Sequence, residues 1–399
     1  MSVFDRILDP ANRADPYPLF DELRRTPVAR QEDGTYVVST YREIVELLHD
    51  PRVSSDRRNL RVPDESPDPA PSFIGLDPPE HDRLRALTMR HFGPPHAPRL
   101  IDGLRPAMLE VTTRLIDGLA DRRQADLVDE VAYPLPVAMI CRILGVPEAD
   151  EPRFHAWADQ IIDTLGPGEH DRAERERARQ AVADQLRGYL GELVERRRAQ
   201  PGDDLLSGLI TDRDGMEPRQ VVATAVLLLI AGHETTINLI ANGMLTFLRD
   251  PALLDRLRAD PGLIVPAVEE LLRYEPPVQL ISSRVALEDI EVAGVTVPAG
   301  SPIVLALAAG SRDPAHVPDP GTFDPCRPGN EHLGFGGGVH YCFGAPLARL
   351  EAQIVLTELI RRLRAPRPAA DPPPYRPSPI LRGPRHLLVD YDGVEPVSS

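Results

Sequence analysis

A glycine-rich loop that ends in a cysteine constrains this chain more than any other stretch. Residues 334–344 read GFGGGVHYCFG, with four glycines before Cys342 and His340 two residues before it. Glycine has no Cβ, so the backbone of this loop can approach a ligand closely. A helix is expected directly afterwards, over residues 345–363, because Pro346 favours a first helical turn. The unpaired N–H groups and the positive dipole end of that helix are expected to stabilise the thiolate of Cys342.

Several kinds of site contain a glycine-rich loop or a cysteine. A phosphate loop is disfavoured because no Gly-Lys-Ser/Thr follows the glycines, and a zinc site is disfavoured because no CxxC or HxxxH pair is found. A buried, inert thiol is the preferred interpretation for Cys141, which lies in the apolar run AMICRIL. For Cys342, a flat ligand held close to the backbone by a thiolate indicates haem iron bound through sulfur.

The loop also resembles the haem-binding signature of the cytochrome P-450 family, Phe-Gly-x-Gly-x-His-x-Cys-x-Gly, at every fixed position. The resemblance implies a mainly α fold, a helical bundle around a long central helix with small β-sheets. It extends over nearly the whole chain, which implies a single domain over residues 1–399. It also implies haem b (iron protoporphyrin IX), with Cys342 as the iron ligand. The other loop residues then expected to bind the cofactor are Phe335, Gly336, His340 and Gly344.

Residues 217–249 form the longest expected helix, with Pro218 in its first turn and Pro251 after its end. At 1.5 Å per residue, this helix would be about 48 Å long. Its apolar run, residues 221–232, has only 12 residues. That length predicts a buried central helix and not a membrane span.

Polar residues in the middle of that helix are unusual. The run Ala231-Gly232-His233-Glu234-Thr235-Thr236 places a carboxylate where burial is costly, next to two small residues that open a groove. One interpretation is structural: Thr235 bonds back to the carbonyl of Ala231, and Glu234 faces solvent. The family resemblance instead implies that Glu234 and Thr235 are a catalytic acid–alcohol pair that relays protons, with Ala231 and Gly232 against the haem.

Basic side chains recur at positions that the family uses for haem propionates. His81 and Arg85 are four residues apart in the expected helix 79–92, so both share one face. From spacing alone, a solvated basic face is the simpler interpretation. The resemblance implies that this pair binds one propionate, that Arg284 binds the second, and that His340 contributes to the same pocket.

Glu270 and Arg273 lie three residues apart in the expected helix 265–274. An exposed pair at this spacing would contribute only about 0.3–0.5 kcal/mol. The resemblance implies a structural role, because the family's Glu-x-x-Arg is completed by an arginine in the loop before the cysteine. Arg327 is placed to be that third member.

Apolar segments indicate a substrate pocket. Residues 62–79 hold six prolines without periodicity, which predicts a lid over that pocket, and a surface insertion is the alternative. The expected lining segments are mostly apolar and favour a medium or large apolar small molecule. These segments are residues 60–76, 227–234, 278–282 and 379–381.

The overall charge excludes some partners. Lys and Arg number 45 against 61 Asp and Glu, a net charge of −16, so nucleic-acid binding is not expected. No apolar stretch is long enough for a membrane anchor, and the start of the chain does not resemble a secretory signal. Three widely spaced cysteines argue against a disulfide framework. These features predict a cytoplasmic location.

The resemblance implies a haem-thiolate monooxygenase that inserts one oxygen atom from dioxygen into its substrate by hydroxylation or epoxidation. The chain has no flavin fingerprint and no second cysteine cluster. Electrons are therefore expected from a ferredoxin or flavodoxin with its reductase, and NAD(P)H acts only indirectly. Four arginines are candidates for docking that partner: Arg90, Arg99, Arg105 and Arg349. A peroxygenase driven by hydrogen peroxide and a non-enzymatic haem sensor remain alternatives, and the Glu234–Thr235 pair argues against the first.

Overall fold

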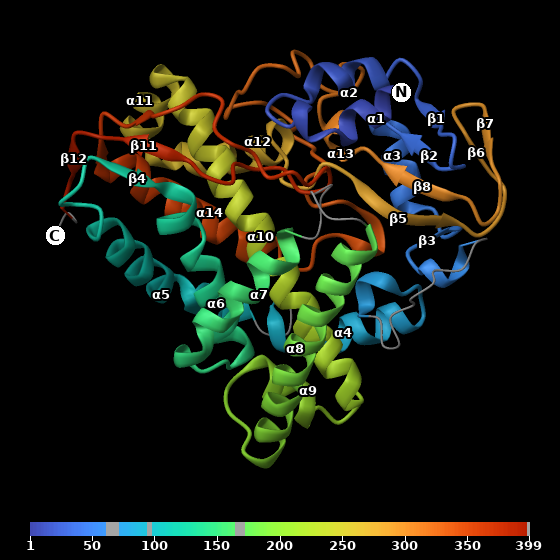
Figure 1. Cartoon of the computed structure of the whole chain (residues 1–399), viewed down its shortest axis with the longest axis horizontal. Helices are drawn as coiled ribbons and strands as arrows, with labels where there is room; N and C mark the ends of the chain where they lie inside the picture. Colours follow the sequence, from blue (N-terminus) through green and yellow to red (C-terminus); the bar gives the residue numbers. More distant parts are fainter. Residues whose placement is uncertain (61–71, 94–97, 164–171, 397–399) are drawn as a thin grey trace.

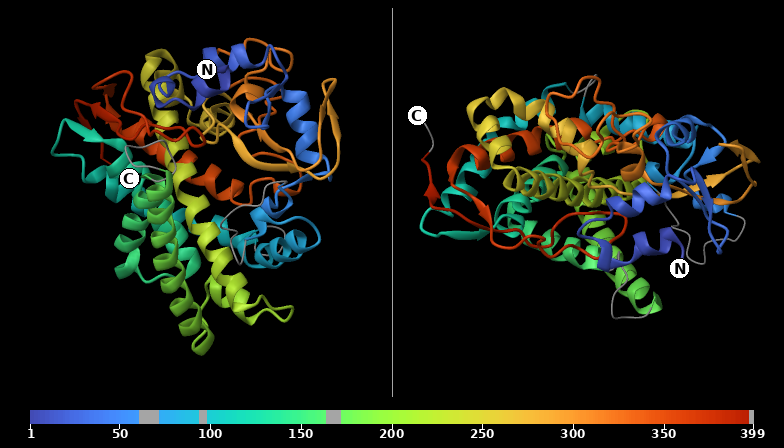
Figure 2. Two further views of the ribbon diagram at one scale, coloured as in Figure 1. Left: turned by 45° about the vertical axis from the view of Figure 1, so that its right-hand side comes forward. Right: turned by 90° about the horizontal axis from the view of Figure 1, so that it is seen from above.

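Helix α10 (Pro218–Arg249) crosses the middle of the molecule (Figures 1 and 2). A capping box between Glu217 and Gln220 begins it, and Pro251 starts the next helix. The helix predicted over residues 217–249 is therefore confirmed. Around α10 pack α6 (Pro134–Leu144), α8 (Arg172–Ala199) and α14 (Ala345–Arg362).

The computed structural model describes residues 1–60, 72–93, 98–163 and 172–396. Its other helices are α1 (Val3–Leu8), α2 (Tyr17–Leu23), α3 (Tyr41–His49), α4 (Glu80–Phe92), α5 (Pro98–Asp117), α7 (Glu151–Asp163), α9 (Leu205–Thr211), α11 (Pro251–Ala259), α12 (Ile264–Tyr274) and α13 (Leu307–Ser311). The helices predicted over residues 79–92, 265–274 and 345–363 match α4, α12 and α14 to within one residue at either end.

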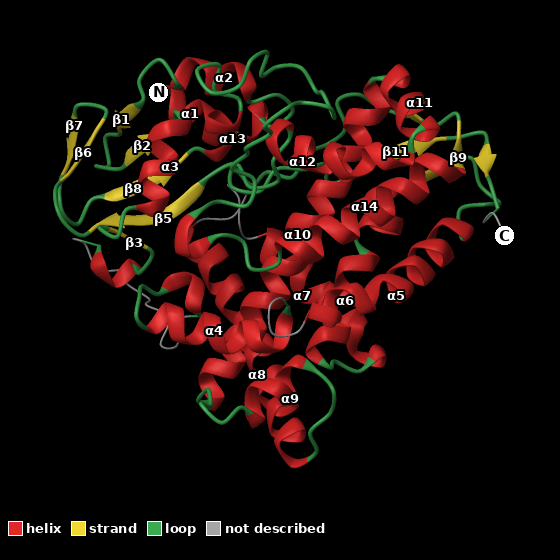
Figure 3. Cartoon of the chain, turned by 180° about the vertical axis from the view of Figure 1, so that it is seen from behind, coloured by secondary structure: helices red, strands yellow, loops and turns green. Residues whose placement is uncertain are grey.

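The strands form small sheets at the edges of the helical body (Figure 3). They are β1 (Val28–Arg30), β2 (Tyr36–Val38), β3 (Val53–Ser54), β4 (Gln124–Asp126), β5 (Ile281–Ala286), β6 (Ile290–Val292), β7 (Val295–Val297), β8 (Pro302–Leu305), β9 (Leu363–Arg364), β10 (Arg367–Pro368), β11 (Leu388–Asp390) and β12 (Gly393–Val394). The largest sheet has the order β1-β2-β8-β5-β3, with only β2 and β8 parallel. The expected mainly α fold with small sheets is confirmed.

The apolar core has separate helical and sheet regions. The larger region is built from helices α4 through α12 together with α14. The central helix α10 contributes fully buried residues such as Ile237 and Met244. A second one packs the five-stranded sheet against α3. The loop that ends in Cys342 contributes Phe335 to the helical region, and Leu333, just before that loop, belongs to the sheet region. Removal of apolar surface from water is the main favourable contribution to folding, and it stabilises the folded state by about 25 cal/mol for each Å² buried.

Among the described helices, α10 alone is long and apolar enough to cross a membrane. Its interfaces with α6, α8 and α14 account for this apolar character, because they bury it within the protein. The prediction of a buried central helix is thus confirmed.

The lid predicted over residues 62–79 lies largely outside the described residues. The part that is described begins at residue 72 and contains a single 3₁₀ turn, Phe73–Gly75. Phe73 and Leu76 are buried, whereas Ile74 is exposed. The apolar patch at this end therefore packs onto the protein.

Candidate active site

The cysteine loop lies tightly against α3. Gly336 and Gly338 have φ angles of 66° and 62°, a left-handed conformation that favours glycine. A Cβ on Gly338 would lie 2.0 Å from the carbonyl oxygen of Leu48, so no larger residue fits. The N–H of Cys342 donates to the carbonyl of Phe335 at 2.9 Å, and α14 begins three residues later. The loop thus presents the cysteine at the start of a helix, as predicted.

The thiol of Cys342 is subject to two opposing effects. Burial raises its pKa, while the N–H groups of Gly344 and Ala345 and the guanidinium groups of Arg85 and Arg349 lower it. Burial is the larger effect, so the net direction is opposite to the one expected from the helix start alone. The donors are present, but they do not compensate the desolvation of a thiolate. A bound metal cation would supply that compensation.

Arg349 fixes the aromatic ring beside the cysteine. Its guanidinium lies 4.5 Å from the ring centre of Phe335 and makes two contacts with Glu269, at 2.6 and 2.8 Å. Arg349 and His332 together hold the pKa of Glu269 at about 2, against the effect of burial. The sequence singled out Arg349 only as a docking residue. The role of Glu269 was missed because its partners lie far away in the sequence.

The middle of α10 presents its acid and its alcohol to different surroundings. The hydroxyl of Thr235 donates to the carbonyl of Ala231 at 2.9 Å, which is the local bond of the structural interpretation. Glu234, however, is buried and does not face solvent. Its Oε1 lies 3.1 Å from Nε of Arg376 and accepts a hydrogen bond from Asn238 at 3.3 Å.

An open patch interrupts the buried surface of α10. Ala231 is exposed and Thr235 is half-buried, although both belong to the helix that crosses the middle of the molecule. Gly232 faces elsewhere, because a Cβ on it would contact Ile140 of α6 at 3.5 Å. A Cβ at that distance would be in ordinary van der Waals contact, so Gly232 lies against α6, whereas Ala231 lies on the open side of α10.

A cluster of basic side chains lies next to the cysteine loop. It consists of His81 and Arg85 of α4, Arg284 of β5, and His340. The rings of His81 and His340 have centres 4.4 Å apart. Nε2 of His81 is buried without a hydrogen-bond partner among the described residues.

Burial and mutual repulsion destabilise the charged forms in this cluster. Burial lowers the pKa of Arg284 to about 10, and it lowers the pKa of His340 to about 3 with a contribution from Arg284, His81 and Arg85. Nearby Asp77 and Asp82 offset this only in part. A site with this many donors and cations fits a ligand with carboxylate groups. The two propionates of haem meet that requirement.

Glu270 holds the loop that precedes the cysteine. Arg273 contacts both of its carboxylate oxygens, at 2.7 and 2.8 Å, and Nε of Arg327 lies 3.1 Å from Oε1. Arg273 also donates to the carbonyls of Pro320 and Thr322 in that loop. Glu270 and Arg273 are fully buried, so the estimate for an exposed pair does not apply to them.

A family model for cytochrome P-450 matches residues 28–389 of the chain. The chain belongs to the cytochrome P-450 family. Members of this family bind haem b, use dioxygen and receive electrons from NAD(P)H through a reductase partner. This cytochrome P-450 is accordingly a haem-thiolate monooxygenase.

Relatives and solved structures cover almost the whole chain. It is 39% identical over 398 residues to the monooxygenase PikC of Streptomyces venezuelae, covering 95% of this chain and 91% of the relative. It is 39% identical to vitamin D(3) 25-hydroxylase of Pseudonocardia autotrophica, with 92% of each chain covered. Ligand-free Mycobacterium smegmatis CYP164A2 has 42% sequence identity and a TM-score of 0.89, and the match covers 97% of this chain and 99% of that one.

Proposed function

We propose that Cys342 is the iron ligand of this cytochrome P-450 and that the basic cluster binds the two haem propionates. The cluster consists of His81, Arg85, Arg284 and His340. The single observation that carries this proposal is the orphaned Nε2 of buried His81 among cations that have too few acidic partners, beside the cysteine loop. Phe335, Gly336 and Gly344 are the loop residues that would hold the haem beside Cys342, and Ala231 would face it from α10, whereas Gly232 lies against Ile140 of α6.

Bound haem supplies the iron at which dioxygen is activated, and the thiolate of Cys342 donates electron density that favours O–O cleavage. The chain's own residues supply protons and exclude water. The hydroxyl of Thr235 exchanges its bond to the carbonyl of Ala231 for a bond toward the open side of α10. Glu234 takes a proton from solvent and passes it toward that hydroxyl. The first step only redirects a hydrogen bond, and the second, a proton transfer by a positioned carboxyl group, is general acid chemistry.

The proposed substrate is a medium or large apolar molecule. Two of the expected lining segments, residues 278–282 and 379–381, come together where Val278 bridges to Leu381 and the N–H of Gln279 donates to the carbonyl of Ile380 at 2.8 Å. Val278, Ile380 and Leu381 are only half-buried, as expected for the wall of a cavity. Relatives named for vitamin D(3) and 6-deoxyerythronolide B oxidation support a substrate of this size.

We place the protein in the cytoplasm with a ferredoxin or flavodoxin as its electron donor. The cysteine loop exposes Val339 and Tyr341 on the surface nearest the thiolate. Arg105 is exposed, whereas Arg90 pairs with Asp214, and the side chain of Arg99 lies outside the described ones. This exposed valine and tyrosine lie beside Arg349, whose guanidinium donates to the Tyr341 hydroxyl at 3.2 Å, and such a surface suits docking of a small acidic redox protein.

The variant Cys342→Ser tests the ligand assignment. We expect it to lose the reduced carbon monoxide spectrum of sulfur-ligated haem, because an alcohol oxygen cannot replace the thiolate. Cys326→Ser, at an exposed cysteine that contacts Arg256 of α11, is the matched control and should retain the spectrum. An unchanged spectrum in Cys342→Ser would refute the assignment. Product formed with dioxygen and a reductase system, compared with hydrogen peroxide alone, separates the monooxygenase from a peroxygenase or a sensor.

A further inference from the structure

The C-terminal segment, defined here as residues 375–385, crosses α10 and contacts it at three successive turns (Figure 1). Arg376 pairs with Glu234. Gly383 lies against Asn238, because a Cβ on this glycine would be 2.1 Å from Oδ1 of that residue. Asn242 donates to the carbonyl of Arg382 at 2.9 Å. The three contacted α10 residues are four apart, so they share one helix face.

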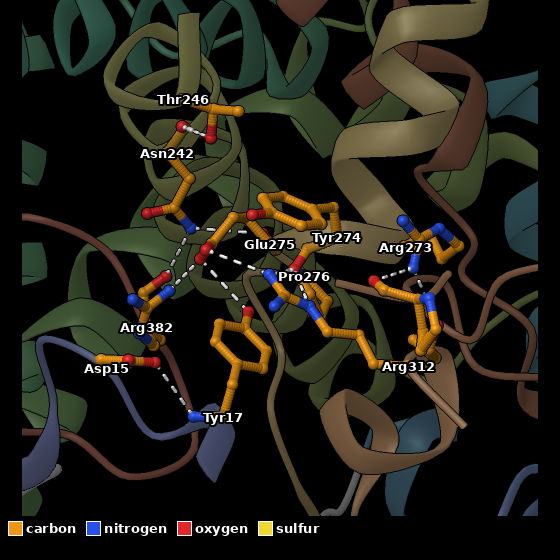
Figure 4. A network of polar contacts seen from close by, with 12 residues as sticks. Asp15, Tyr17, Asn242, Thr246, Arg273, Tyr274, Glu275, Pro276, Arg312 and Arg382 are labelled. Carbon is orange, nitrogen blue, oxygen red and sulfur yellow. Dashed lines mark hydrogen bonds and ion pairs between the residues drawn. The ribbon is translucent and has the colours of Figure 1, made fainter. Parts of the chain in front are cut away.

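Arg382 fixes this segment in place (Figure 4). Its guanidinium is fully buried, pairs with Glu275, and donates to the carbonyls of Arg13 and Ala14, at 2.9 Å each. The hydroxyl of Tyr17 donates to the same carboxylate at 3.2 Å. The network joins the N-terminal region, the end of α12 and the C-terminal segment. The position of Arg376 over α10 is therefore set by contacts outside the active site.

The pair of Arg376 and Glu234 is buried and loosely bonded. The side chains are 2% and 3% exposed, and Nε lies 3.1 Å from Oε1. Nε and Nη2 of Arg376 have no hydrogen-bond partner among the described residues, so the N–H groups are not aligned with an acceptor. Neither charge is stable in such surroundings without the other. Opposite charge, and not an optimal hydrogen bond, holds the two together.

We propose that Arg376 is a positioning residue for proton delivery in this enzyme: it holds the Glu234 carboxylate toward the C-terminal segment, and opening of this ion pair releases the carboxylate to the Thr235 side. The inference rests on the proposed proton relay. In each cycle the released carboxylate takes one proton from water and passes one proton toward the Thr235 hydroxyl. It then returns to Arg376 as a carboxylate, so no net charge accumulates.

A double-mutant cycle tests the inference on the haem-loaded enzyme, with a substrate identified by its spin-state shift. Glu234→Gln should slow product formation several-fold and raise its solvent isotope effect. Arg376→Gln should do the same, and Arg376→Lys should restore most of the rate because an ammonium group keeps the charge. If Arg376 acts through Glu234, Arg376→Gln should have no further effect in the Glu234→Gln background. Arg385→Gln, at an exposed pair in the same segment, should match wild type.

Infrared spectroscopy supplies a readout that a purely structural role would not change. Arg376→Gln should add a protonated-carboxyl band to the one expected from Glu351 in every variant, and wild type and the double variant should lack this added band, because a buried carboxyl without its cation takes up a proton. If Arg376→Gln does not bind haem, the double variant, which buries no unpaired charge, is compared with Glu234→Gln alone. Independent, additive effects, or an unchanged rate and infrared spectrum, would overturn the inference. If Glu234→Gln and Thr235→Ala both formed as much product per electron pair consumed as wild type, the underlying relay would be rejected instead.

Discussion

Thr235 is adjacent to Glu234, yet the two side chains have different partners. The hydroxyl of Thr235 donates to the carbonyl of Ala231, and the carboxylate of Glu234 lies against Arg376. Successive helical residues are about 100° apart around the axis, so one side chain can face the open patch while the other faces the C-terminal segment. In the proposed relay, the Thr235 hydroxyl must therefore break its bond to Ala231 before it takes part in proton transfer.

Thr235→Ala should uncouple electron consumption from product formation. The methyl group cannot donate a hydrogen bond, so we expect less product per electron pair and several-fold more hydrogen peroxide. Thr246→Ala is a matched control, because Thr246 makes the same bond to the carbonyl four residues back, at 2.7 Å, farther along α10. Peroxide and product are quantified against NAD(P)H consumed. Unchanged coupling in Thr235→Ala would contradict the proposed relay.

At the scale of single elements, local sequence patterns predicted most helices well. Apolar spacing and flanking prolines located α4, α10, α12 and α14, because both signals act within a few residues. The pairing of Arg376 with Glu234 had no such signal. Its two members lie far apart in the chain, and neither the RPSPILRGPR stretch nor the helix carries a pattern that names its partner.

The basic cluster shows a second limit of the sequence. His81 and Arg85 share a helix face by spacing, but spacing alone favoured a solvated surface. The family resemblance was needed to place Arg284 and His340 beside them. Burial of His81 and Arg284 is a tertiary property, which depends on how segments distant in the sequence pack together, such as α4 against the cysteine loop, and no local rule predicts it.

Glu270→Gln should destabilise the loop before the cysteine. The substitution removes the charge that Arg273 and Arg327 share, leaving buried cations at a cost of about 3–5 kcal/mol. We expect a lower urea midpoint and a lower haem content. Glu195→Gln, which removes an exposed pair with Arg198 on α8, should change the unfolding free energy by less than about 1 kcal/mol. Equal effects of the two variants would exclude a structural role for Glu270.

At the scale of the whole molecule, Glu351 links stability to pH. It lies on α14, and both of its oxygens are buried without a hydrogen-bond partner among the described residues. Burial raises its pKa from 4.5 to about 8, and the nearby Thr236 hydroxyl opposes this only weakly. A raised carboxyl pKa favours the folded state below pH 4.5, and this contribution is lost as the pH rises from 4.5 toward 8.

Glu351→Gln should therefore flatten the dependence of stability on pH. One proton bound in the folded state but not in the unfolded state contributes a slope of up to about 1.4 kcal/mol per pH unit. Urea midpoints of wild type and variant are compared at several pH values within that interval. Glu358→Gln, on the same helix and paired with Arg361, is the control and should keep the wild-type slope. If stability depended on pH with the wild-type slope in Glu351→Gln as well, the Glu351 carboxyl would not titrate within that pH interval.

The crossing of α10 by residues 375–385 has a consequence for biosynthesis. The ribosome makes the acid-bearing helix long before it makes the arginine that neutralises it. A nascent chain that stops short of this arginine holds a carboxylate whose burial is opposed by its lost hydration. This buried pair therefore forms only after the C-terminal segment has been made, and a chain that stops before residue 376 would lack the cation that lies against Glu234.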